Sequence, residues 1–192
     1  MRFLPESKVR AGLLLLVMVM PVWATEPSEQ LLLKADNGDV SAMFQMGVAF
    51  LSGKVSSSHS GKALQYLEQV ASSHQSELSS QAKTWLGRAY RDALSGTDKD
   101  LKKSFSYFEQ AAGKEGKNPE AQYELGKAYL NGMGTDRNLI AAYMWTAISL
   151  HKTSSVEAQA KEQKQQLTGM LNDLQLEKAR ELVTQLETLY LN

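Results

Sequence analysis

The sequence predicts an all-α protein, and more specifically an α-solenoid of antiparallel helix pairs. Two observations predict this fold class. A short motif centred on a glycine occurs three times at a spacing of about 40 residues, which is in the range of helical repeat units. In addition, no stretch alternates polar and apolar residues with the period of two that a half-buried β-strand shows, so we expect essentially no strand.

The first motif has the pattern of one helix face. In each copy an alanine, a leucine or methionine, a glycine and an aromatic residue stand at positions i, i+4, i+5 and i+8, and the glycines are Gly47, Gly87 and Gly126. At about 100° per residue these four positions lie on one side of a helix. A glycine inside a helix costs about 1 kcal/mol. We therefore expect another helix to approach closely at each of these glycines.

A second motif follows each copy of the first. It begins at Ala63, Ser104 and Ala142, and in each case an aromatic residue stands three positions later. Residues at i and i+3 are neighbours on a helix surface. Each unit is therefore predicted to contain a second helix, whose face of small and aromatic residues meets the first helix.

Helix boundaries are marked by capping residues. Asn118 followed by Pro119 predicts a helix start, because proline is favoured at the first helical position. Ser154 and Glu157 have the spacing of a capping box, and Asn172 resembles an asparagine cap of the same kind. Helix ends are predicted at three glycines, which are Gly38, Gly53 and Gly132.

Taken together, these residues resemble the Sel-one-like repeats (SLR), a branch of the tetratricopeptide-like (TPR-like) helical solenoids. The third unit matches that family's pattern best, through Gly126, Gly132, Gly134 and Trp145. The resemblance covers about residues 28–190. It implies an SLR/TPR-like superhelix, in which the first helix of each unit lines the concave side.

Two of the three turns between paired helices depart from the family pattern. Val55 stands where the second loop glycine of unit one is expected. In unit two, Ala93 and Ser95 replace both loop glycines. Unit two also carries one extra residue, and we expect these two turns to be longer or looser than the family norm.

The chain is predicted to consist of consecutive segments with different roles. A signal peptide precedes a linker with an N-terminal helix, three repeats follow, and capping helices close the array. The segments are 1–24 for the signal peptide, 25–38 for the linker and helix, 39–75, 76–117 and 118–153 for the repeats, and 154–192 for the capping helices.

The N-terminus predicts export. Arg2, Lys8 and Arg10 precede an uninterrupted apolar run over residues 11–20, and small residues at the end of the segment suit cleavage after Ala24. The alternative is a transmembrane anchor, but a membrane span needs about 20 apolar residues. We therefore expect a cleaved signal and a periplasmic or secreted protein that is not held in a membrane after cleavage.

The composition and the motifs indicate no catalytic or metal-binding site. The chain has no cysteine, and its 21 basic and 21 acidic residues balance, which argues against a nucleic-acid partner. His59, His74 and His151 are too far apart in sequence for a recognisable metal motif. No nucleophile elbow or phosphate loop occurs. We therefore expect no catalytic residue, no cofactor and no metal, and a chain that is not an enzyme.

The resemblance implies a binding surface on the concave side. Its candidate residues, called the concave row below, are Phe44, Val48, Leu51, Thr84, Arg88, Arg91, Tyr123, Lys127 and Leu130. A complementary partner segment would carry an apolar anchor at one end and acidic residues opposite the arginines near the middle. The alternative for the apolar members is burial against an N-terminal helix that contains leucines 31–33.

Members of the family mostly serve as adaptors, so the resemblance implies an exported scaffold that binds a protein or peptide segment. The alternatives are an enzyme or β-lactam binder, and a secreted host-interaction factor.

The last helix is predicted to cover the open end of the array. Its regular apolar seam, which contains Leu176, Ala179, Val183, Leu186 and Tyr190, leaves a homodimer as the alternative.

Overall fold

The structure is a computed structural model that describes residues 29–53, 60–74, 76–114 and 117–190. The predicted signal peptide, its cleavage site after Ala24 and the linker before α1 lie outside these ranges. So do Val55 and His59. The predictions made for these residues therefore remain predictions.

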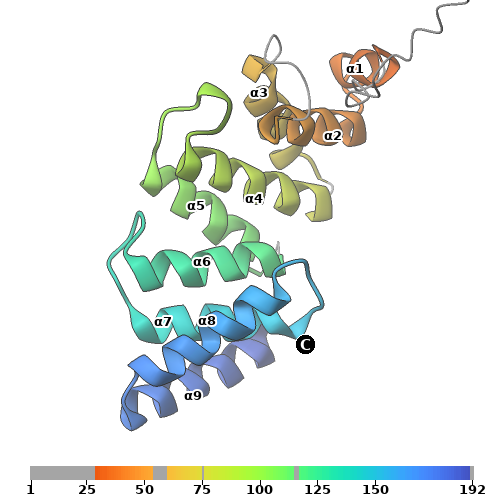
Figure 1. The fold of residues 1–192 in the computed structure, drawn as a ribbon. Coiled ribbons are helices and arrows are strands. Elements are labelled where there is room, and N and C mark those ends of the chain that lie inside the picture. Colours follow the sequence, from red (N-terminus) through yellow and green to blue (C-terminus); the bar gives the residue numbers. More distant parts are fainter. Residues whose placement is uncertain (1–28, 54–59, 75, 115–116, 191–192) are drawn as a thin grey trace, which may run out of the picture.

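The described part of the chain contains nine α-helices and no strand, which confirms the predicted fold class. From α1 to α8 each helix packs against its neighbours along the chain, whereas α9 packs against α7, and Figure 1 shows the resulting single stack. Its elements are α1 (Glu29–Asp36), α2 (Val40–Leu51), α3 (Ser60–Ala71), α4 (Ser76–Asp92), α5 (Leu101–Ala112), α6 (Pro119–Asn131), α7 (Leu139–Ile148), α8 (Glu157–Met170) and α9 (Asp173–Tyr190). Two short 3₁₀ turns, η2 (Leu94–Gly96) and η3 (Ser149–His151), follow α4 and α7. None of the helices in the described ranges is long and apolar enough to cross a membrane.

The paired helices approach each other most closely at the motif glycine. A Cβ atom on Gly126 would lie 2.5 Å from Thr146 Oγ1 and 3.1 Å from the backbone oxygen of Ala142 on α7. Both distances are shorter than ordinary van der Waals contact, so only glycine fits without movement. The same holds in the other two units, where a Cβ on Gly47 or Gly87 would meet the side chain of Leu67 or Phe108. The close approach predicted from the repeat is confirmed.

Apolar side chains fill the interfaces between these helices. Met46, Phe50 and Leu67 are buried in the first unit, and Phe108 and Leu125 are buried between the second and third. Burial of this kind gives about 1.5–3 kcal/mol per large side chain. The core is therefore continuous along the stack, as a repeat array requires.

The last helix covers the end of the array. Ala179 of α9 is buried, and Leu176 and Val183 pack with it against the cluster that contains Tyr143 of α7. Three residues of the predicted seam thus contact their own chain and are not free to dimerise. Leu189 near the end of α9 remains exposed.

The capping predictions have mixed outcomes. The side chain of Asn118 accepts a hydrogen bond from the backbone N–H of Ala121 at 3.1 Å, as expected for an N-cap. Asn172 and Gln175 cap each other reciprocally, with bonds of 3.2 and 2.9 Å. The box predicted at Ser154 is wrong, because α8 has Val156 as its N-cap. Val156 is buried, and this apolar anchor fixes the helix start two residues after Ser154.

The turn of unit two keeps the backbone of a glycine turn without the glycines. Gly132 and Gly134 have φ angles of 68° and 77°, and Ala93 and Ser95 at the equivalent places have φ angles of 54° and 52°. The left-handed region is disfavoured for residues with a Cβ by about 1–3 kcal/mol each. The turn of unit two is one residue longer than that of unit three, spanning residues 93–100 against 132–138, and at Ala93 and Ser95 its backbone is strained rather than loose.

Replacing Gly126 by alanine is expected to lower the free energy of unfolding by about 1–3 kcal/mol, because the new methyl group would press on α7. The melting temperature should fall by several degrees. The matched control is Gly169→Ala in α8, where a Cβ would meet no atom within 4 Å. That change should stabilise the helix by about 0.5–1 kcal/mol. Thermal unfolding followed by circular dichroism measures both, and equal melting temperatures would contradict the packing described.

Candidate functional site

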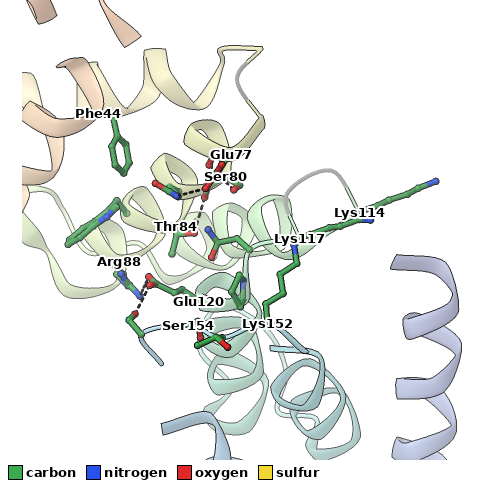
Figure 2. Close-up of a pocket in the computed structure, with 16 residues that line it drawn as sticks. Phe44, Glu77, Ser80, Thr84, Arg88, Lys114, Lys117, Glu120, Lys152 and Ser154 are labelled. Atoms are coloured by element: carbon green, nitrogen blue, oxygen red, sulfur yellow. Dashed lines mark hydrogen bonds and ion pairs between the residues drawn. The ribbon is translucent and has the colours of Figure 1, made fainter. Parts of the chain in front are cut away.

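A groove of about 940 Å³ opens on the face formed by the first helices of the units. Its walls come from α2, from α4, from the start of α6 and from the segment that follows η3. Figure 2 shows Phe44 at one end and Lys117 and Lys152 at the other, with Arg88 and Glu120 between them. The residues that define this groove below are Phe44, Thr84, Trp85, Arg88, Lys117, Glu120 and Lys152.

The concave row occupies several environments. Phe44, Thr84 and Arg88 line the groove. Leu51 and Leu130 are buried and do not line the groove, with 5 and 8 % of their surface exposed, whereas Thr84 lines the groove with only 2 % of its surface exposed. The remaining members, which are half-buried and do not line the groove, are Val48, Arg91, Tyr123 and Lys127.

The apolar members of unit one contact the N-terminal helix. Phe44, Val48 and Leu51 belong to the same apolar cluster as Leu31 and Leu32 of α1. Leu33 points away and is 62 % exposed. Leu51 is thus buried, and Phe44 and Val48 are partly buried, in a core to which the N-terminal helix contributes.

The two arginines of α4 are engaged by carboxylates of α6. Arg88 donates to Glu120 at 3.0 Å and to Glu124 at 3.1 Å. Arg91 donates to Glu124 and also to Asp92, the latter at 2.7 Å. The Glu124 side chain is only 7 % exposed. Such a buried carboxylate is stable only when charged or polar partners surround it, and here two guanidinium groups do so.

This network changes the character of the predicted surface. Both arginines are paired with carboxylates of their own chain, which argues against the expectation that they attract acidic residues of a partner. The hydrogen bonds from Arg91 lower the pKa of Asp92, and the bond to Asp92 raises the pKa of Arg91. The arginines therefore join units two and three and form part of the scaffold.

Trp85 is the main aromatic surface of the groove and was not among the predicted residues. It is half-buried, and the guanidinium carbon of Arg88 lies 5.4 Å from its ring centroid, within the range of a cation–π contact. Its neighbour Thr84 donates to the backbone oxygen of Ser80 at 2.9 Å. Trp85 directly follows Thr84, which is one of the predicted residues. Its place in the sequence could have marked Trp85 as a groove residue, since both side chains line the groove.

The described residues assemble no group of three histidines or carboxylates that could hold a metal ion. His151 instead bonds Glu187 of α9 at 2.8 Å. In the groove, Glu120 accepts hydrogen bonds from Arg88 and from the hydroxyl of Ser155. The bond from Ser155 to Glu120 connects α6 with the segment after η3.

The fold and the groove define a helical-repeat solenoid with a concave surface. The model of the Sel1 repeat matches residues 40–73, 80–114 and 119–149, and the chain belongs to the Sel1 repeat family. Proteins with these repeats typically act as scaffolds for protein–protein interaction. No curated protein matches the sequence closely enough to count as a relative.

Two solved structures resemble this fold. One is a protective antigen of uropathogenic Escherichia coli that displays an SLR fold, with a TM-score of 0.72 and 23% sequence identity. The match covers 84% of this chain and 32% of the antigen, so the chain spans about a third of that protein. The other is a Sel1 repeat protein from Oxalobacter formigenes, with a TM-score of 0.56 and 29% identity over 72% of this chain and 96% of that one.

Removing either side of the Arg88–Glu124 pair is expected to destabilise the fold by about 1–3 kcal/mol, because the remaining group loses one of its two charged partners and keeps only Arg91 or Glu120, respectively. Arg88→Ala and Glu124→Ala should both lower the melting temperature by several degrees. The matched control is Lys161→Ala, which breaks an i,i+4 pair whose lysine is 65 % exposed and should cost about 0.5 kcal/mol or less. Chemical denaturation measures the three variants, and equal losses would contradict a structural role for the network.

Proposed function

We propose that this protein is an exported adaptor that binds a segment of a partner protein in the groove. The observation that carries the proposal is the groove itself, which combines the exposed parts of Phe44 and Trp85 with charged side chains at its other end. Interfaces usually depend on a few aromatic anchors surrounded by polar residues. The scaffold role typical of Sel1 repeats supports the same proposal.

The groove has the dimensions of a peptide site. Its volume of about 940 Å³ is at the upper end of small-molecule pockets, and it crosses from unit one to the segment after unit three. An extended segment could contact several repeats at once, which is how solenoids use their concave surfaces. The enzyme, β-lactam-binder and host-interaction alternatives gain no supporting observation from the described residues.

Export is proposed on the sequence alone. The basic start, the apolar run over residues 11–20 and the site after Ala24 have the three-part pattern of a cleaved signal. The protein recovered from the envelope or the medium should therefore begin at Thr25. N-terminal sequencing decides this, and a chain that keeps residues 1–24 would contradict it.

Trp85→Ala is expected to weaken partner binding at least tenfold, because an aromatic anchor truncated at an interface typically costs about 2 kcal/mol or more. The measurement is quantitative pull-down from an envelope extract, with the amount of folded protein checked by circular dichroism. Tyr123→Ala belongs to the predicted row but lies outside the groove, so it should weaken binding less. Lys161→Ala on α8 is the control and should leave binding unchanged. Equal capture by Trp85→Ala and the parent would refute the groove as the binding site.

A further inference from the structure

Lys117 has a backbone conformation that suits glycine better than lysine. Its φ angle is 44°, in the left-handed region, and it immediately precedes Asn118, the N-cap of α6. The equivalent place before Asp39, the N-cap of α2, is occupied by Gly38 with a φ angle of 88°. Residues kept in strained conformations are often found at functional sites. The turn alone therefore does not explain why position 117 holds a lysine.

That side chain contributes positive charge to one end of the groove. Lys117 and Lys152 both line it, and neither forms an ion pair with any described residue. Lys114 also lines this end of the groove, although in Figure 2 its side chain extends away from those of Lys117 and Lys152. Three lysines therefore contribute positive charge here, and Lys117 and Lys152 are the two whose side chains lie near each other.

The groove's other charges do not cancel these two lysines. Glu120 is bound to Arg88 and to the hydroxyl of Ser155, so its negative charge is already paired with Arg88. The remaining carboxylate of the groove is that of Glu77, which accepts a bond from Gln81 on α4. In Figure 2 Glu77 lies beside Ser80, away from Lys152. An anionic group entering beside Lys117 and Lys152 would thus meet two ammonium groups that lack a partner.

The opposite end of the groove is apolar. Phe44 and Trp85 come from α2 and α4, and each keeps part of its side chain exposed. Arg88 covers one face of the Trp85 ring and leaves an aromatic surface beside Phe44. A ligand that fills the groove therefore needs an apolar part and an anionic part, separated along its length.

We propose that the groove binds an extended peptide segment that carries an aromatic or aliphatic residue toward one end and acidic residues toward the other. The apolar side chain lies against Phe44 and Trp85, and the carboxylates lie between Lys117 and Lys152. This assignment rests on the proposed adaptor function and specifies the partner's chemistry. A nucleic acid would require a longer basic track than three lysines on a chain whose charges balance.

The test is selection of a random-peptide display library on the purified protein. The expected peptides contain aspartate or glutamate separated along the segment from an aromatic or aliphatic residue. In a synthetic copy of the most enriched peptide, glutamine and asparagine in place of the acidic residues should weaken binding about tenfold, as measured by fluorescence anisotropy. Higher salt should weaken it further, because the lysines are accessible to solvent ions.

Variants of the protein locate the contact. The double variant Lys117→Gly/Lys152→Gln should bind the selected peptide about tenfold more weakly. Glycine suits the backbone at position 117, so this variant should melt no lower than the parent. Lys161→Gln is the control and should change affinity less than twofold, because this exposed lysine of α8 does not line the groove.

Three results would overturn the proposal. Enriched peptides without acidic residues that still depend on Trp85 would refute the acidic segment and leave the groove as a peptide site. Acidic peptides indifferent to the double variant would place the contact elsewhere. A library that yields no enriched peptide would refute a peptide ligand of this kind. The adaptor function is tested separately, by the pull-down that compares Trp85→Ala with the parent.

Discussion

The close approach of two helices at a glycine is the constraint on which the rest of the structure depends. At Gly126 the backbone of α7 comes so near that a side chain would overlap Thr146. The same contact in all three units sets the same geometry for each helix pair, so that α2, α4 and α6 turn toward one face. The groove exists because this geometry is repeated, and its walls are the parts of those helices that face away from their paired helix.

Electrostatics determines how that face presents itself. The carboxylates of Glu120 and Glu124 neutralise Arg88 and Arg91 and tie the second unit to the third. A surface that appears basic in sequence is therefore internally balanced at its centre. Unbalanced charge remains in the turns at the edge of the groove, where Lys117 lies. The scaffold and the candidate binding surface thus use different charged residues, and changes to one can be tested apart from the other.

The periodic parts of the structure were predictable from sequence, and the contacts between units were not. The spacing of Gly47, Gly87 and Gly126 predicts the helix pairs, because each copy of a repeated motif packs against its paired helix in the same way. A helical wheel treats each helix alone, so it could not show that Glu124 of α6 would engage the arginines of α4. Lys117 lies in a turn, where no periodicity marks the direction of a side chain.

Local signals also failed where burial competed with them. Ser154 has the spacing of a capping box, yet the burial of Val156 moves the start of α8 and leaves the hydroxyl of Ser154 without a hydrogen-bond partner among the described residues. Ala93 and Ser95 lack the freedom of glycine, yet the packing of the adjacent helices imposes the same left-handed turn. In both places tertiary contacts outweigh about 1–3 kcal/mol of local preference.

The most direct test of the groove as the binding site is site-specific photo-crosslinking in native cells. A photoreactive phenylalanine analogue at Trp85 faces the groove, and the same analogue at Lys161 of α8 faces outward from an exposed position. The account predicts that the Trp85 position forms a crosslink to a single partner segment, identified by mass spectrometry, and that the Lys161 position does not. Crosslinks from Lys161 with none from Trp85 would contradict it.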